Sequence, residues 1–257
     1  MIVRPKIIGF ICNWSLPREF NTTNISGLEG HPKMHMIRLT CIGRIDPVII
    51  LDAFAKGADG VLLIGCHPPD CHFIEGNLQA ERKIKTLKDL MSLTGLEPLR
   101  LHIDWAHRSE TEHFVKIIND FRNQIIALGL SPLAKEKPNT NILLNMEAAK
   151  AAAENFRLRA LIGKEKELVE GENVYGERTP PNEFFSLLHE TIETEFLRCK
   201  IHLLTKERSL SVKEIAAITE LKPASVLDHI VELRKKRMII LDHVDKNTPL
   251  YKALEVE

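Results

Sequence analysis

Val61-Leu-Leu-Ile-Gly65 is an unbroken apolar run that leads directly into the segment Cys66-His-Pro-Pro-Asp-Cys71. An apolar run without polar alternation is typical of a β-strand that helices cover on both faces, as in a parallel sheet. Strand-like and helix-like patterns alternate on either side of this run, along residues 6–129. This alternation predicts parallel βαβ units with right-handed crossovers, and therefore an α/β fold for the N-terminal part of the chain.

The hydrophobic patterns also place the individual elements. Strands are expected at residues 6–11, 36–40, 60–64 and 99–105, and helices at 46–57, 77–93 and 109–129. Asp46-Pro47 has the residue types of a helix start, with aspartate as the cap and proline in the first turn. Ser109 and Glu112 have the spacing of a capping box. A loop with Gly27 and Gly30 is expected after the first strand. The whole N-terminal domain is expected to be a parallel βαβ domain of the flavodoxin or Rossmann type.

Three cysteines lie where predicted strands end, and a fourth lies in the loop that follows the last of them. Cys12 follows the first strand, Cys41 the second and Cys66 the third, and Cys71 lies in the loop after Cys66. The carboxyl ends of parallel strands share one edge of the sheet, and ligands bind in the crevice there. The sequence therefore predicts that thiols distant along the chain meet at this edge, and four thiolates are what a small iron–sulfur cluster needs.

The residues alone leave other uses of these thiols open. A structural zinc site usually has two close cysteine pairs, whereas Cys12 and Cys41 stand alone, which disfavours zinc. A thioredoxin-like dithiol needs a Cys-x-x-Cys motif, and the sequence has none. Free cysteines are also often buried as ordinary core residues. We found no GxGxxG or phosphate-binding Gly-Lys-Ser/Thr motif, so we expect no catalytic nucleotide site.

Composition and charge narrow the class of protein. Lysine plus arginine equals aspartate plus glutamate at 35 each, so no net positive charge attracts nucleic acid or a membrane surface. No apolar run reaches the length of a transmembrane helix, and residues 1–6 do not have the architecture of a signal peptide. The odd count of five cysteines does not suggest a secreted disulfide scaffold. A cytoplasmic protein without a membrane partner is expected.

The last third of the chain has a different pattern. A helix is expected at 141–161, between linkers at 131–140 and 163–181, followed by a helix at 184–204. Ser211 and Glu214 then form a capping box, Pro223 begins a further helix, and residues 238–254 have the pattern of a hairpin. This order predicts a winged helix-turn-helix domain. The expected domains are 1–135, the α/β domain; 136–180, a helix and linker; and 181–257, the winged helix.

Several sequence blocks in the N-terminal domain resemble a known family. They are Phe10-Ile-Cys-Asn-Trp14, Cys41-Ile-Gly-Arg44, Gly57-Ala-Asp-Gly-Val61 and Gly65-Cys-His-Pro-Pro-Asp-Cys-His72. In this order they resemble the delta subunit of methyl-viologen-reducing hydrogenase, over residues 5–130. The resemblance implies a [2Fe–2S] cluster. It also implies electron relay between a hydrogenase or formate dehydrogenase and a heterodisulfide reductase-like flavoprotein.

The resemblance has one departure in the first block. The family often has Cys-Cys-Asn-Trp-Cys there, whereas this chain has Ile11 and Ser15 in place of the outer two cysteines. Four cysteines of the matching blocks are present, the number that a [2Fe–2S] cluster requires. We therefore expect the ligands to be the four cysteines of the strand ends and their loop: Cys12, Cys41, Cys66 and Cys71. If the true family ligand were the one replaced by Ser15, the cluster would be altered or lost.

Other side chains near the thiols have expected supporting roles. We expect Trp14 to pack in the core, with Asn13 near the cluster sulfurs. With four cysteines available, we expect His67 and His72 to form hydrogen bonds or face a partner, and not to bind iron as in a Rieske centre. Arg44 either stabilises a reduced cluster or forms a surface salt bridge.

Three functions follow from this sequence. The favoured one is an electron-transfer subunit of a cytoplasmic redox complex, which has no catalytic residues of its own. The alternative is a redox-sensing transcription regulator that binds DNA through the winged helix. The C-terminal domain has no excess of basic residues, which favours protein docking over nucleic acid. A zinc-stabilised scaffold is the weakest option. Cys199 is expected to pack in a helix, away from the cluster.

Overall fold

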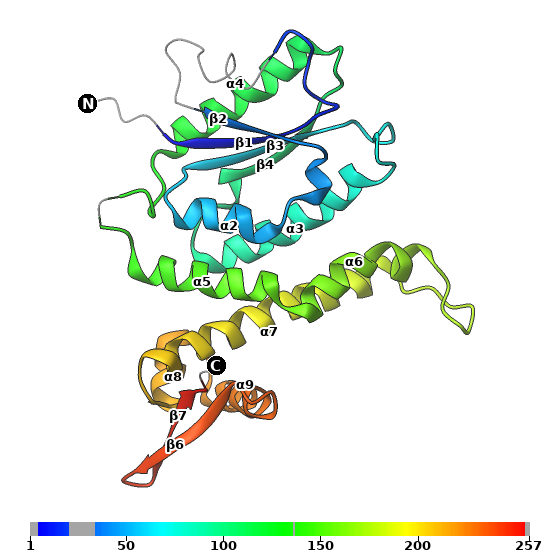
Figure 1. The fold of residues 1–257 in the computed structure, drawn as a ribbon. Helices are drawn as coiled ribbons and strands as arrows, with labels where there is room; N and C mark the ends of the chain where they lie inside the picture. The colour runs from blue at the N-terminus through cyan, green and yellow to red at the C-terminus, as the bar shows by residue number, and fades with distance from the viewer. Residues whose placement is uncertain (1–4, 21–33, 136, 255–257) are drawn as a thin grey trace.

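A four-stranded parallel sheet forms the centre of the N-terminal half, in the order β2-β1-β3-β4. The structure is a computed structural model that describes residues 5–20, 34–135 and 137–254. The strands are β1 (Ile7–Cys12), β2 (Met34–Leu39), β3 (Gly60–Gly65) and β4 (Leu101–Trp105). The expected α/β architecture with a parallel sheet is therefore confirmed (Figure 1). The predicted loop that contains Gly27 and Gly30 lies outside the described residues.

Helices cover both faces of this sheet, as the apolar strands require. The helices are α2 (Pro47–Ala55), α3 (Gly76–Thr94) and α4 (Thr111–Leu128). Figure 1 shows α4 on one face, with α2 and α3 on the other. The strand side chains alternate accordingly: Ile11 and Leu62 belong to the hydrophobic cluster under α4, whereas Phe10 and Leu63 belong to the cluster with α2 and α3.

The predicted helix starts have different outcomes. Asp46 caps α2, because its Oδ1 accepts a hydrogen bond from the backbone N–H of Val48 at 3.0 Å. The predicted capping box of Ser109 and Glu112 is wrong, since α4 begins at Thr111 after Glu110 and has no side-chain cap. The predicted fourth strand also starts later, because η2 (Pro98–Arg100) is a 3-10 turn and the strand begins at Leu101.

Three further helices form a layer beneath α2 and α3 (Figure 1). They are α5 (Thr140–Glu154), α6 (Phe156–Glu170) and α7 (Pro181–Glu207). The expected single helix at 141–161 is thus two helices, since Asn155 leaves the helical conformation and its side chain caps α6. The expected linker at 163–181 is helical as far as Glu170. No helix in the described part of the chain is long and apolar enough to cross a membrane.

The C-terminal residues form a small unit with its own core. Its elements are β5 (Leu210–Ser211), α8 (Val212–Thr219), α9 (Pro223–Lys235), β6 (Ile239–Asp245) and β7 (Thr248–Ala253). The capping box of Ser211 and Glu214 is confirmed. The expected hairpin is present as the antiparallel pair β6–β7, and β7 also pairs with β5.

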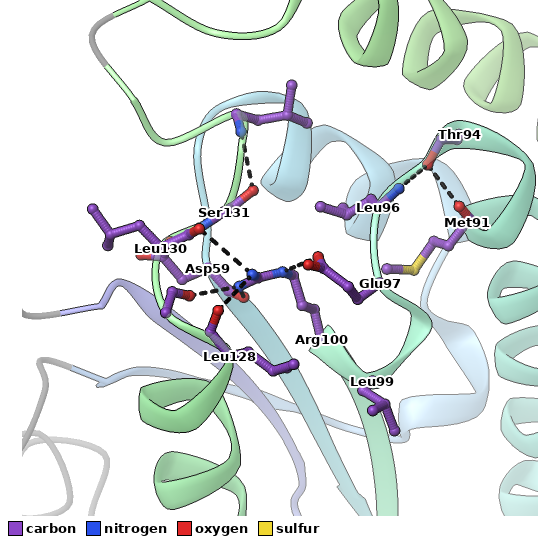
Figure 2. A network of polar contacts seen from close by, with 12 residues as sticks. Asp59, Met91, Thr94, Leu96, Glu97, Leu99, Arg100, Leu128, Leu130 and Ser131 are labelled. Carbon is purple, nitrogen blue, oxygen red and sulfur yellow. Dashed lines mark hydrogen bonds and ion pairs between the residues drawn. The ribbon is translucent and has the colours of Figure 1, made fainter.

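A buried arginine holds the segments that precede β3 and β4, at the ends of these strands opposite the cysteines. Figure 2 shows its network of polar contacts. Arg100 is 1% exposed, and its guanidinium donates hydrogen bonds to the carbonyls of Asp59 and Gly129 at 3.0 and 2.9 Å. It also pairs with the Glu97 carboxylate at 2.7 Å. The Asp59 carboxylate accepts from the backbone N–H of Ser131 at 2.6 Å. This network closes the α/β domain where the chain leaves it for α5.

Candidate metal centre

Three neighbouring strands bring three thiols to one edge of the sheet. Cys12 is the last residue of β1, Cys66 directly follows β3, and Cys41 lies two residues after β2, where it precedes η1 (Ile42–Arg44). Because β1 lies between β2 and β3, the carboxyl ends of the three strands are adjacent. The predicted convergence of these distant residues therefore follows from the strand order.

The first pair of thiols is in direct contact. Cys12 Sγ and Cys66 Sγ are 3.5 Å apart, and both side chains are buried. Two thiolates bound to one tetrahedral metal at about 2.3 Å would lie about 3.8 Å from each other. The observed separation is thus close to that of two ligands on one metal atom.

The second pair, Cys41 and Cys71, lies on either side of Gly76. A methyl group built on Gly76 would be 2.4 Å from Cys41 Sγ and 3.4 Å from Cys71 Sγ. Gly43 packs equally closely on the backbone of Gly76, where a side chain would also collide. The two glycines allow η1 and the start of α3 to approach each other, and this approach brings the second pair together.

Hydrogen bonds hold the loops that carry these thiols. Cys41 Sγ accepts a hydrogen bond from the backbone N–H of Gly43 at 3.4 Å. Asn77 Nδ2, at the start of α3, donates to the Cys66 carbonyl at 3.1 Å. Lys83 Nζ donates to the Gly43 carbonyl at 2.8 Å, which closes the last turn of η1. The sequence analysis assigned no role to Lys83. Its position on the side of the predicted helix that faces the sheet was the only signal for such a role.

The thiols of the first pair differ in acidity because they share a proton. The hydrogen bond from Cys12 lowers the pKa of Cys66, and the side chains of Ser15 and Cys71 lower this pKa further against the effect of burial. The same hydrogen bond raises the pKa of Cys12, and burial raises it further. Burial raises the pKa of Cys41. Cys66 is therefore the first of these thiols to become a thiolate, the form that binds metal.

The aromatic side chains lie at the rim of the site and not in the core. Trp14 is 37% exposed and stacks on His72 with the ring centroids 3.5 Å apart, so the expectation that Trp14 packs in the core is wrong. His67 pairs with Glu110 at 3.0 Å. The hydrogen-bonding role expected for His67 is thereby confirmed, and His72 makes ring contacts with Trp14 and Phe73.

The remaining residues singled out in the sequence make no hydrogen bond or ion pair with these four thiols in the described part of the chain. Asn13 accepts a hydrogen bond from Arg38. Arg44 borders a cavity of about 220 Å³ together with Asp46 and Lys83, between η1, α3 and α6. Cys199 is buried in α7 within the hydrophobic core, as expected.

The four thiols form two neighbouring pairs, and the pairs adjoin each other, because the Cys71 side chain also interacts with Cys66. Within residues 5–20, 34–135 and 137–254, no group of three or more His, Cys, Asp or Glu side chains is arranged to hold a metal ion. A cluster with two irons takes two thiolates on each iron. The pairs Cys12–Cys66 and Cys41–Cys71 match that requirement, so the donor set fits a diiron cluster.

Comparisons with known proteins place the N-terminal half in a family. The family model described as methyl-viologen-reducing hydrogenase, delta subunit, matches residues 7–129. The chain is 41% identical over 125 residues to the vhc iron–sulfur subunit of F420-non-reducing hydrogenase from Methanococcus voltae, which covers 49% of this chain and 87% of that protein. It is 35% identical over 125 residues to the corresponding F420-non-reducing hydrogenase iron–sulfur subunit of Archaeoglobus profundus, covering 49% of this chain and 91% of the relative.

A third relative contains the same domain as a small part of a longer chain. It is one of the subunits of the ferredoxin/F(420)H(2)-dependent CoB-CoM heterodisulfide reductase of Methanosarcina acetivorans, 35% identical over 132 residues. The match covers 51% of this chain but only 16% of that protein. Since the two hydrogenase subunits are matched over most of their length, this chain belongs to the methyl-viologen-reducing hydrogenase delta subunit family.

Proposed function

We propose that this chain is an electron-transfer subunit that holds a [2Fe–2S] cluster on Cys12, Cys41, Cys66 and Cys71. It would relay single electrons between a hydrogenase or formate dehydrogenase module and a heterodisulfide reductase-like flavoprotein. The relatives support the electron-transfer role, because they are named as hydrogenase iron–sulfur subunits and as part of a heterodisulfide reductase. They give no support to the DNA-binding regulator.

The observation that carries this proposal is the pairing of four thiols from distant segments. Cys12 and Cys66 are 54 positions apart in sequence and 3.5 Å apart at their sulfurs. Cys41 and Cys71 meet around Gly76.

The chain's own residues prepare the site for metal. Metal binding requires thiolates, so each bound thiol releases its proton. Cys66, with its lowered pKa, gives up its proton first. Cys12 keeps its proton longer, because it donates this proton to Cys66 and because burial also raises its pKa. When bound, the cluster supplies a one-electron redox couple.

The partner's redox group is expected to approach beside Cys71. Cys71 is half-buried, whereas the other three thiols of the site are buried. Phe73 and Ile74, close to it in the same loop, are 45% and 81% exposed, and Trp14 stacks on His72 beside Cys71. Exposed apolar side chains that gather at one place mark protein contact sites. Because electron tunnelling falls steeply with distance, a partner docked on this loop would exchange electrons fastest.

We also propose that residues 181–257 form a winged-helix domain that docks protein. The order of α8, α9 and the β6–β7 hairpin is that of a winged helix-turn-helix. The outer face of α9 exposes Leu227 and Val231, apolar side chains that do not suit a phosphate backbone. We propose the same domain boundaries as above: 1–135 for the α/β domain, 136–180 for the connecting segment and 181–257 for the winged helix. The connecting segment packs on the first domain through α5 and α6.

Anaerobic purification followed by iron, sulfide and zinc analysis and EPR spectroscopy tests this function. We expect two irons and two sulfides per chain and a paramagnetic signal that appears on one-electron reduction. Changing any of the four thiols to serine should lower the iron content, whereas Cys199→Ser, a buried thiol in α7, serves as the control that retains it. Zinc without iron, or full iron binding by Cys12→Ser, would contradict the proposal.

A further inference from the structure

A cavity of about 220 Å³ lies between the α/β domain and the layer of helices beneath it (Figure 1). Its lining comes from η1, the start of α2, α3, the end of α5 and α6. The family match ends at residue 129, so the walls that α5 and α6 contribute lie outside it. The closed cavity is therefore a property of this chain, and the family domain alone does not form it.

One side of the cavity is apolar. Leu87 and Leu90 of α3 and Leu158 of α6 line it, and each is at most 1% exposed. An apolar cavity of about 150 Å³ is large enough to bind benzene. By the same proportion, the cavity between η1, α3 and α6 holds an organic molecule about one and a half times the size of benzene.

The other side of the cavity carries a net positive charge. Among the described residues that line it, the charged ones are Arg44, Asp46, Lys83 and Arg159. Arg159 donates two hydrogen bonds of 3.0 Å to the Asp46 carboxylate, so these two charges compensate each other. Arg44 and Lys83 remain, and within the described ranges neither forms an ion pair with a carboxylate.

Lys83 has one donor left for a ligand. Its ammonium group carries three N–H groups, and two of them donate to the carbonyls of Gly43 and Ile45 at 2.8 and 3.3 Å. Carbonyls are neutral, so they leave the positive charge uncompensated. Lys83 is half-buried, and an anion stabilises a half-buried cation more than an exposed one, because less water screens the two charges. Arg44 is exposed, and its guanidinium has the planar donor geometry that matches a carboxylate.

We propose that this cavity binds a small organic monocarboxylate. The carboxylate accepts hydrogen bonds from Lys83 and Arg44, and the hydrocarbon part packs against the three buried leucines. An inorganic anion would leave the apolar side unused, whereas a neutral apolar ligand would leave both cations without a counter-ion. This site goes beyond the proposed function, and its ligand binds whether or not the cluster is present.

Isothermal titration calorimetry of the purified full-length chain with benzoate tests the site. Benzamide and benzylamine serve as neutral and cationic analogues of similar size. We expect saturable binding of benzoate with a Kd of about 1 mM or lower. Benzamide should bind at least about tenfold more weakly, since it loses the interaction between charged groups, and benzylamine should not bind. Nuclear Overhauser effects between the benzoate ring protons and the methyl groups of Leu87, Leu90 and Leu158 should locate the ligand.

Variants of the two cations test the recognition of the carboxylate. Arg44→Gln and Lys83→Met should each weaken benzoate binding by about threefold to tenfold, and Arg44→Glu should weaken it further. Arg44→Gln should leave thermal unfolding without ligand unchanged, because the arginine side chain is exposed. Arg178→Gln is the matched control, since this exposed arginine pairs with Glu172 in the loop after α6 and does not line the cavity. It should bind benzoate as the wild type does.

The outcomes that overturn the proposal are distinct. One is the absence of saturable binding up to about 10 mM benzoate, and another is binding of benzamide as tight as that of benzoate. Ligand contacts with other methyl groups, or unchanged affinity in both Arg44→Gln and Lys83→Met, would also overturn it. Benzoate binding is measured without iron, so a chain that takes up no iron would refute the proposed function and leave this inference standing.

Discussion

Substituting Gly76 by alanine should prevent binding of the proposed cluster while the metal-free protein still folds. The added methyl carbon would lie 2.4 Å from Cys41 Sγ, where about 3.5–4.0 Å is an ordinary contact, so the sulfur must move by about 1 Å. Metal–ligand distances tolerate about 0.2 Å. A displacement of this size therefore takes Cys41 out of binding geometry, and Cys71 Sγ, at 3.4 Å, is crowded as well.

The stability of the metal-free Gly76→Ala protein should change little. Overpacking a close contact costs about 1–3 kcal/mol. Gly76 begins α3, and replacing glycine by alanine in a helix returns up to about 1 kcal/mol. We expect the free energy of unfolding, measured in urea, to fall by about 0–2 kcal/mol. The iron content should fall below one tenth of the wild-type value, which corresponds to a loss of at least about 1.4 kcal/mol in the free energy of iron binding.

Gly163→Ala in α6 provides the control. A methyl group built on Gly163 meets nothing within 4 Å, so this change should stabilise the helix by about 1 kcal/mol and leave iron binding intact. If Gly76→Ala kept full iron content and the wild-type EPR spectrum, the reasoning that this glycine brings Cys41 and Cys71 together would be refuted.

Three further changes test the structure away from this glycine. Arg100→Met should destabilise the protein by about 3–5 kcal/mol in urea unfolding, because it leaves buried carbonyls unpaired; a loss below about 1 kcal/mol would contradict the network of Figure 2. Ile74 has a φ of +66° and is 81% exposed, so Ile74→Gly should raise stability by up to about 1 kcal/mol while weakening partner binding in pull-down and electron-transfer assays. Burial and then Arg198 lower the pKa of His229, so the folded state binds fewer protons than the unfolded state below about pH 6.5. Stability should therefore fall as the pH drops below this value, and His229→Gln should show a smaller fall in pH-dependent thermal unfolding; equal slopes would count against the burial of this imidazole.

The sequence predicted the parallel sheet because its strands are buried on both faces. An apolar run such as Gly60–Gly65 is typical of a strand that helices cover on both faces, and topology brings the thiols that follow these strands to one edge of the sheet. The approximate place of the site was therefore predictable from three strand ends.

The pairing of the thiols was not predictable in the same way. Which sulfur contacts which depends on how closely η1 approaches α3, and this approach depends on Gly43 and Gly76. The sequence alone does not distinguish a glycine that permits such a close contact from one that only permits a turn. Asn155 posed a similar problem, since it ends one helix and caps the next with no proline or glycine nearby.

The capping box at Ser109 failed because another contact uses the local polar groups. Glu110 Oε2 accepts from the backbone N–H of His107 at 2.8 Å and pairs with His67, which delays the helix start to Thr111. Ser109 instead contacts the His107 ring at 2.8 Å. Contacts between His67 and Glu110 join segments 43 positions apart, so local spacing could not predict this result.

Helix α6, which lies outside the family match, braces both loops of the Cys41–Cys71 pair. Arg159 forms two hydrogen bonds of 3.0 Å with Asp46, the residue that caps α2 after the Cys41 loop. Lys166 pairs with Glu75, the cap residue of α3 after the Cys71 loop. Exposed ion pairs contribute little to stability one at a time, but these two act at the ends of the segments that position the sulfurs. The C-terminal half is therefore connected to the more exposed thiol pair, and the Cys12–Cys66 pair is held by the sheet itself.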